Sequence, residues 1–236
     1  MADQRPLYAV LIDADNIPAR FATAILKEIT TFGEPALRRV YGDWGSDRLR
    51  PWTEQVRALG LVAHQETANT KGKNASDIGL VIDAMDILHT GRFDGFVLVS
   101  SDSDFTALAN RVREQGLDVI GIGESKAPES LRNVCNRFIM IENIMDEPAP
   151  SKGTEKPSGK MKPLEAQPLI IRAMEKIDTD DEWVTMGQLG QYLTAEHPDF
   201  DTRSYGKRKL SDLIDDLKLF ESKRGPGNQL MVRRLD

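Results

Sequence analysis

Residues 95–104 read GFVLVSSDSD, an apolar run that ends in a cluster of serines and aspartates. A short apolar run without polar alternation is typical of a strand that is buried on both faces, as in the middle of a parallel sheet. We therefore predict a buried strand at residues 95–100. Asp102 and Asp104 then lie in the loop just past its carboxyl end.

The N-terminal segment repeats this pattern, since the apolar residues 8–12 run into the acidic turn of residues 13–16, DADN. Strand-like and helix-like segments alternate from there to about residue 145, which indicates an α/β domain with a parallel sheet and helices on both faces. Further strands are predicted at residues 36–41, 61–65, 118–122 and 138–141. Helices are predicted from Pro18 to near Gly33, between the second and third strands, and over residues 75–88 and 105–115. The helix over residues 75–88 is apolar on most sides, which predicts burial.

The character of the chain changes at residues 148–163, PAPSKGTEKPSGKMKP, which contain four prolines and four lysines. Such a composition is typical of a linker. Beyond it, three apolar stripes at helical spacing precede two short strand-like runs around the turn at residues 225–228. We predict a first domain over residues 1–146, a linker over 147–163 and a small α+β, winged-helix-like domain over 164–236.

Composition sets limits on the class of protein. The chain has a formal net charge of −6, which argues against nucleic-acid binding through bulk positive charge, although carboxylates that hold divalent cations would also lower the sequence charge. The single cysteine rules out an internal disulfide and makes a cysteine-based zinc site untenable. No stretch approaches the length of a membrane span, so we expect no membrane association and a cytoplasmic location.

Acidic and amide side chains gather where the carboxyl ends of the predicted strands should meet, which is where open parallel sheets bind ligands. They are Asp13, Asp15 and Asn16 after the first strand, Asp77 at the start of the helix over residues 75–88, and Asp102 and Asp104 after the fourth strand. Crowded carboxylates repel one another unless a cation neutralises them or some take up protons. Hard oxygen ligands favour Mg²⁺ or Mn²⁺, and such an ion can assist phosphodiester cleavage.

Other interpretations of the same residues remain open. Each acidic segment could be no more than a turn or a helix cap. The segment DADNI also resembles the nucleophile motif of haloacid-dehalogenase-like phosphatases, with Asp13 phosphorylated and Asp15 as acid/base. Ile17 departs from that motif, and no lysine motif follows in the required order. A third alternative is an RNA-binding adaptor that keeps a nuclease fold without turnover.

Three segments together resemble the motifs of the NYN family of PIN-like nucleases: LIDADN, KGKNASDIGLVIDAMD and FVLVSSDSDF. The resemblance implies a PIN-like ribonuclease that acts on single-stranded RNA with Mg²⁺ or Mn²⁺. It implies metal ligands at Asp13, Asp77, Asp102 and Asp104, and a further catalytic residue at Asn16. Asp15 and Asp83 would be outer partners of these ligands. Lys71 and Lys73, in the loop before Asp77, would contact phosphate or belong simply to a solvated loop.

The C-terminal segment, roughly residues 165–235, resembles the LOTUS (OST-HTH) domain, most clearly in FDTRSYG at residues 200–206. This resemblance implies RNA binding, with a leaning toward G-rich or quadruplex RNA. The basic residues expected to contact RNA are Arg203, Lys207, Arg208, Lys209 and Arg224, and the local cluster around Arg224 also contains Lys223, Arg233 and Arg234. The alternative is a domain that docks a protein partner. In the first domain, Arg48 and Arg50 lie near Trp44 and Trp52 in the sequence and could form a nucleic-acid lip, or the tryptophans could pack in the core. Whether the protein is a homo-oligomer stays open.

Overall fold

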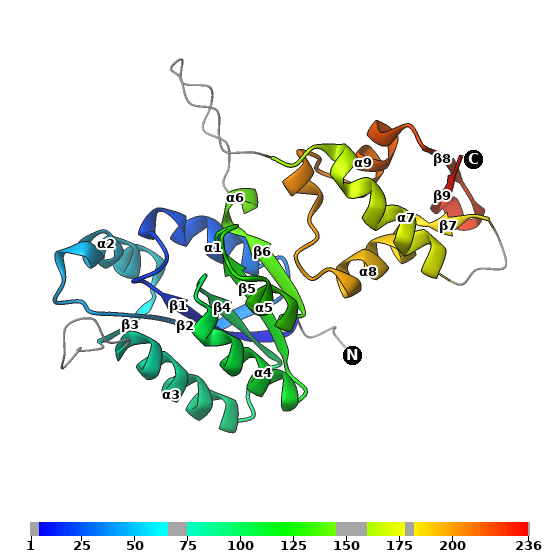
Figure 1. Ribbon diagram of the computed structural model, residues 1–236. Coiled ribbons are helices and arrows are strands. Elements are labelled where there is room, and N and C mark those ends of the chain that lie inside the picture. The colour runs from blue at the N-terminus through cyan, green and yellow to red at the C-terminus, as the bar shows by residue number, and fades with distance from the viewer. Residues whose placement is uncertain (1–4, 66–74, 145–159, 178–181, 236) are drawn as a thin grey trace, which may run out of the picture. The chain divides into compact units, whose positions relative to one another are not determined.

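The computed structural model describes residues 5–65, 75–144, 160–177 and 182–235, with only the backbone for residues 75 and 76. The chain divides into two compact units, Met1–Glu147 and Pro148–Asp236 (Figure 1). Most of the predicted linker, with the loop that carries Lys71 and Lys73, lies outside the described residues. The linker therefore stays a prediction. Among the described residues, no helix is both long and apolar enough to cross a membrane.

The first unit is built on a six-stranded parallel sheet in the order β3-β2-β1-β4-β5-β6. Its strands are β1 (Leu7–Asp13), β2 (Glu34–Gly42), β3 (Val62–Gln65), β4 (Gly95–Val99), β5 (Asp118–Gly123) and β6 (Arg137–Met140). This confirms the predicted parallel α/β fold, and a strand lies at or within a residue or two of every predicted position. The strand order reverses between β1 and β4, and open parallel sheets bind ligands at such a switch point.

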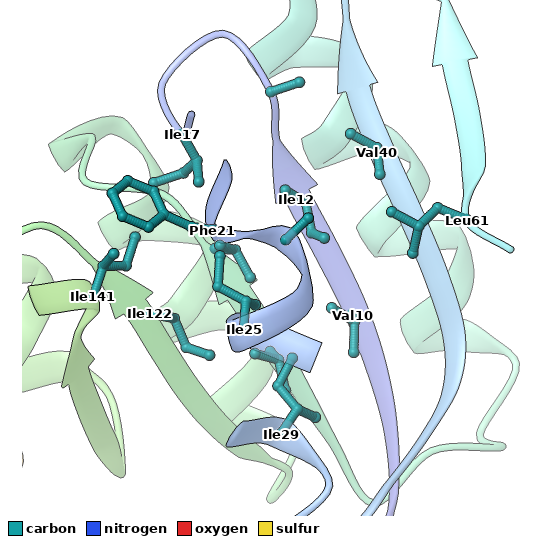
Figure 2. Close-up of a cluster of buried hydrophobic side chains, with 14 of the residues drawn as sticks. Val10, Ile12, Ile17, Phe21, Ile25, Ile29, Val40, Leu61, Ile122 and Ile141 are labelled. Carbon is teal, nitrogen blue, oxygen red and sulfur yellow. The ribbon is translucent and has the colours of Figure 1, made fainter. Parts of the chain in front are cut away.

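Helices cover both faces of the sheet (Figure 1). They are α1 (Ala22–Ile29), α2 (Arg50–Leu59) and α6 (Ile141–Ile144) on one face, and α3 (Ala75–His89), α4 (Thr106–Glu114) and α5 (Glu129–Val134) on the other. Successive strand side chains point to opposite faces, so Val10 and Ile12 of β1 join the first core whereas Ala9 and Leu11 join the second. Figure 2 shows the first core, in which Ile25 packs with these strand residues.

Helix α3 is less buried than its composition predicts. Its inner side contributes Leu80, Ala84 and Ile87 to the core, but Ile78 and Ile82 are 61% and 59% exposed. A helix that lies on one face of a sheet can bury only one side, whatever the residues on the other. The expectation of a fully buried helix was therefore wrong for its outer side.

A polar clamp ties α3 to the sheet. Asp83 accepts a hydrogen bond from the hydroxyl of Tyr41 on β2 and forms an ion pair with Arg39 on the same strand. The side chains of Arg39 and Asp83 are only 28% and 20% exposed. Removing one member of such a partly buried set leaves the others without a partner. The clamp fixes the rotation of α3, and with it the direction in which Asp77 projects from the first turn.

The second unit combines three helices with a small antiparallel sheet in the order β7-β9-β8. Its elements are α7 (Gln167–Lys176), β7 (Val184–Thr185), α8 (Met186–Glu196), α9 (Leu210–Leu217), β8 (Phe220–Arg224) and β9 (Leu230–Arg234). Thr185 begins α8 with a capping box, since its hydroxyl accepts the Gln188 N–H and the Gln188 side chain accepts the Thr185 N–H. The predicted helices and hairpin are present, and the two-residue strand β7 is an addition.

The Asp83 clamp gives a stability prediction. Replacing Asp83 with Ala leaves the Arg39 guanidinium and the Tyr41 hydroxyl partly buried without their partner. We expect the free energy of unfolding to fall by about 1.5–3 kcal/mol. Asp86→Ala, on the exposed side of the same helix, should change it by less than about 0.5 kcal/mol. Urea unfolding followed by far-ultraviolet circular dichroism measures both, and equal effects would show that the clamp contributes nothing specific.

Candidate active site

The site lies where β1 and β4 end side by side. These strands pair in parallel, with Ile12 opposite Val99, so the residues that follow them emerge at the same edge of the sheet. Asp13 is the last residue of β1, and Ser100 is the first residue after β4. Both are buried. Proximity at this edge thus follows from the strand register alone.

Asp13 is fixed by three hydrogen bonds. Its Oδ1 accepts the backbone N–H groups of Asp15 and Asn16, each at 3.1 Å, and its Oδ2 accepts the Ser100 hydroxyl at 2.9 Å. Burial raises the pKa of Asp13 to about 7, and repulsion from Asp77 and Asp15 adds to the effect. The hydrogen bonds from Ser100 and Asn16 lower this pKa but do not offset the burial. Without a cation, the Asp13 carboxyl is therefore partly protonated near neutral pH. A bound cation would stabilise its charged form.

Three further carboxylates come together beside it. Oxygen atoms of Asp77, Asp102 and Asp104 lie within 4.8 Å of one another. They come from separate segments, namely the first turn of α3, the loop after β4, and the 3-10 helix Ser103–Phe105. Burial raises the pKa of Asp77, and repulsion from Asp102 and Asp104 raises it further. Such mutual repulsion is what a divalent cation would relieve.

Asp102 also has the structural role that its sequence suggests. Its Oδ1 accepts the Asp104 N–H at 3.0 Å and so caps the 3-10 helix, and its own N–H donates to Ser100 Oγ at 3.1 Å. A carboxylate has about four lone-pair positions, so capping leaves Asp102 able to hold a cation as well. The two interpretations of this aspartate are compatible.

Asn16 and Gly123 complete the inner part of the edge. The side-chain oxygen of Asn16 is buried and accepts no hydrogen bond from the described residues. An unsatisfied buried acceptor costs about 1–3 kcal/mol, so a donor from solvent or ligand is expected there. At Gly123, a Cβ atom would lie 2.5 Å from the Ser100 carbonyl oxygen, so the end of β5 can approach the acidic loop only without a side chain.

Of the two tryptophans considered for a nucleic-acid lip, Trp44 is the one that keeps some exposure, although it also packs against the first core. Trp44 is half-buried, and its Nε1 donates to the His64 carbonyl at 2.8 Å. Arg48 is exposed and donates to the Asp15 carbonyl at 3.3 Å, which places its guanidinium next to the acidic turn. Trp52 is 2% exposed and belongs to the core, so it cannot stack on a nucleic acid.

The structure separates the predicted RNA-binding residues into distinct groups. Lys71 and Lys73 lie outside the described residues. Arg203 is paired with Asp201 at 2.7 Å, and Lys207 with Asp216 at 3.1 Å, so a carboxylate neutralises each of these two cations. The others remain on the surface of the second unit: Arg208, Lys209 and Arg224 are exposed.

Two residues of interest escaped the sequence analysis. Ser100 is one, because a serine at a strand end has no distinctive signal until its hydrogen bonds to Asp13 and Asp102 are known. The other is Trp183 in the second unit, whose ring centroid lies 3.8 Å from Lys223 Nζ and 4.9 Å from Arg233 Cζ. Because Trp183 comes just before a two-residue strand, no periodic pattern in the sequence predicts which residues lie beside it.

The fold and the acidic edge define the first unit as a PIN-like α/β domain of the nuclease type. Residues 8–142 match the NYN domain, and the chain belongs to this family. Residues 163–232 match the OST-HTH/LOTUS domain. The protein is therefore ribonuclease-like and carries a C-terminal domain of an RNA-binding class.

Three solved structures are similar to parts of this chain, and the first of them supports the fold. A protein of unknown function from Vibrio parahaemolyticus is similar with a TM-score of 0.51 and 20% identity, over 60% of this chain and 96% of that one. An uncharacterized protein from Nitrosomonas europaea shares 31% identity over 39% of this chain and 93% of that one, with a TM-score of 0.29. MurG from Acinetobacter baumannii gives a TM-score of 0.39 at 12% identity, over 83% of this chain and 65% of that one. Among curated proteins, none matches.

The raised pKa of Asp13 gives a pH-dependent prediction. The native state keeps the Asp13 proton up to about pH 7, whereas the unfolded chain loses it near 3.8, so wild-type stability falls as pH rises between these values. Asp13→Asn carries no charge and should avoid this loss. Without metal at pH 8, we expect its melting temperature to exceed that of wild type by about 3–6 °C.

The same comparison at pH 4.5 provides the internal check. There Asp13 is neutral in the native state and only the first part of the stability loss above pH 3.8 has occurred, so the gap should shrink to a minor part of its size at pH 8. Asp47→Asn, an exposed carboxylate that begins the 3-10 helix Asp47–Leu49, serves as the matched control and should shift the melting temperature little at either pH. A gap of the same size at both values would mean that charge burial at Asp13 is not its cause. Thermal melts by circular dichroism in EDTA suffice.

Proposed function

We propose that this protein is a metal-dependent ribonuclease that hydrolyses phosphodiester bonds of single-stranded RNA, with the C-terminal domain binding the RNA. The observation that carries the proposal is the convergence of Asp77, Asp102 and Asp104 within 4.8 Å at the switch point of the sheet. Membership of the NYN family supports a nuclease, and the LOTUS domain supports RNA as the polymer.

The donor set fits Mg²⁺ or Mn²⁺. Asp77, Asp102 and Asp104 offer carboxylate oxygens, which are the ligands these hard cations prefer. Asp13 lies outside this group of three, and it would complete the set through the one lone-pair position, of about four, that its three hydrogen bonds leave free. When bound, the cation would supply Lewis acidity toward the scissile phosphate and lower the pKa of a water molecule.

The chain's own residues would act by positioning. Ser100 holds the Asp13 carboxylate in place and, through the Asp102 N–H, couples it to the loop after β4. Asn16 presents a buried oxygen that receives no hydrogen bond from the described part of the chain, which suits a hydroxyl of the RNA or a water of the cation's hydration shell. Arg48, next to the acidic turn, would offset phosphate charge at the rim.

The geometry disfavours a phosphatase that uses Asp13 as its nucleophile. Such a nucleophile needs an oxygen that a phosphorus atom with its substituents can approach, which takes more room than a cation needs at a single lone pair. Asp13 is 3% exposed, and both of its oxygens accept hydrogen bonds. An RNA-binding adaptor without turnover is the remaining alternative, and it differs from the proposal in measurable activity.

Substitution of the proposed ligands tests the activity. Asp102→Asn and Asp77→Asn should each lower Mn²⁺-dependent cleavage of an unstructured RNA by at least about 100-fold, because even an outer partner of a metal ligand is worth roughly 10–100-fold. Asp86→Asn, on the exposed side of α3, is the matched control and should cleave as wild type does. Initial rates from denaturing gels, with each protein purified identically, give the comparison.

The choice of substrate separates the alternatives. The proposal requires cleavage of single-stranded RNA above duplex RNA and matched DNA, no turnover of a small phosphomonoester, and no cleavage in EDTA. A G-rich RNA that forms a quadruplex should bind more tightly than an unstructured one if the second domain prefers such RNA. Binding without cleavage under any divalent cation would establish the adaptor, and undiminished cleavage by both ligand variants would remove the acidic edge from the reaction.

A further inference from the structure

The outer face of the small sheet carries an aromatic and basic cluster. Val184 of β7 and Val232 of β9 pair with one another and point into the core. Because strand side chains alternate, Met231 of β9 points outward, as does Lys223, its partner on β8. Trp183, the residue before Val184, lies on the same outward side, half-buried.

The two cationic side chains beside the Trp183 indole differ in whether an ion pair holds them. Arg233 is held by Glu221 at 2.8 Å and by Glu182 at 3.1 Å, so its charge is neutralised. Lys223 is exposed, and its ammonium group lies over the Trp183 ring. Within the described part of the chain it has no carboxylate partner. A lysine with a flexible stem can leave an aromatic face for a phosphate without breaking an ion pair.

Beside the indole the surface is hollowed. The hollow has a volume of about 400 Å³, and its lining comprises Trp183, Lys223, Arg224, Gly225, Pro226 and Met231. The tryptophan, proline and methionine supply the apolar part of the lining, and the lysine and arginine supply positive charge. None of the described residues that line it is acidic. A volume of this size falls within the range of small-ligand sites, roughly 300–1,000 Å³.

Contacts within the hairpin turn position two of the residues that line the hollow. At Gly225 a Cβ atom would lie 2.3 Å from Met231 Sδ, so a side chain there would displace the flexible methionine from its present position. Arg224 Nη1 donates to the Asn228 side-chain oxygen at 2.9 Å and to its carbonyl at 3.3 Å. These contacts position the guanidinium, whose remaining N–H groups can still donate.

We propose that this hollow binds one nucleotide unit of single-stranded RNA, with the base against Trp183 and its phosphate between Lys223 and Arg224. The inference rests on the RNA binding of the proposed function, and it assigns the contact to the hairpin. A flat aromatic surface beside unneutralised cations matches a stacked base and its phosphate, as in single-strand binding grooves. Arg203 and Lys207 are poorer candidates for a phosphate contact, because each is already paired with an aspartate.

The test follows the indole N–H signals of the full chain. The protein has three tryptophans, so selective ¹⁵N labelling gives three indole signals, and Trp183→Phe identifies the one that belongs to Trp183. The probe is a hexameric oligoadenylate RNA, added in EDTA so that binding is measured without hydrolysis. We expect the Trp183 signal to shift on titration, and the signal of the buried Trp52 to stay in place.

Binding measurements on variants give the second readout. Trp183→Leu should weaken the affinity about tenfold, within the range for loss of one stacked base. Lys223→Gln should reduce the slope of log affinity against log salt by about 0.7, the value for one phosphate contact on a single strand. Lys218→Gln, an exposed lysine outside the hollow, is the matched control and should leave the slope unchanged. Variants count only if their thermal transitions match that of wild type.

The outcomes separate this inference from the proposed function. If the RNA binds while the Trp183 signal stays fixed and Trp183→Leu keeps full affinity, the hairpin site is wrong and RNA binding elsewhere stands. If no RNA binds at all, the hairpin site and the proposed RNA-binding role of the second domain fall together. Loss of cleavage in the ligand variants bears only on the acidic edge, since the binding measurements contain no metal.

Discussion

The hydroxyl of Ser100 joins the two strands on which the candidate site depends. It donates to the buried carboxylate of Asp13 at the end of β1 and accepts the N–H of Asp102 in the loop after β4. The pairing of β1 with β4 sets the register at this edge, and this one small side chain then links the acidic turn to the acidic loop. Without it, the Asp13 carboxylate would lose a hydrogen bond that opposes the rise in its pKa. The remaining carboxylates are placed relative to this pair by α3 and the 3-10 helix.

The cluster of carboxylates lowers the stability of the folded state, and packing elsewhere in the first unit offsets this loss. Burial and mutual repulsion raise the pKa values of Asp13 and Asp77. Two apolar cores flank the sheet, and the Asp83 clamp holds α3 against β2. A cation that binds only the folded state would return part of this free energy, in proportion to the logarithm of its concentration over its dissociation constant. Metal binding, stability and the charge state of Asp13 are therefore linked in the proposed function.

The sequence predicts the first fold well because strong physical rules govern it. Apolar runs locate β1 and β4, and the carboxyl ends of parallel strands meet, so Asp13 and Asp102 are expected together before any coordinates are known. Contacts that join segments far apart in the sequence cannot be predicted in this way. The partners of Arg203 and Lys207, the exposure of Ile82 and the role of Ser100 all depend on which side of an element meets its neighbour. Trp183 escaped for the same reason, since only the pairing of β7 with β9 brings it to the hairpin.

The two units offer RNA opposite electrostatic surroundings. The acidic edge of the first unit repels a phosphate backbone until a cation is bound, and the chain as a whole has a formal net charge of −6. The hairpin of the second unit instead presents an aromatic ring beside Lys223 and Arg224, two cations that no described carboxylate neutralises. In the proposed function, affinity for RNA therefore comes mainly from the second unit and hydrolysis from the first. Joining the two in one chain raises the effective concentration of bound RNA at the acidic edge, so weak binding there is sufficient for cleavage.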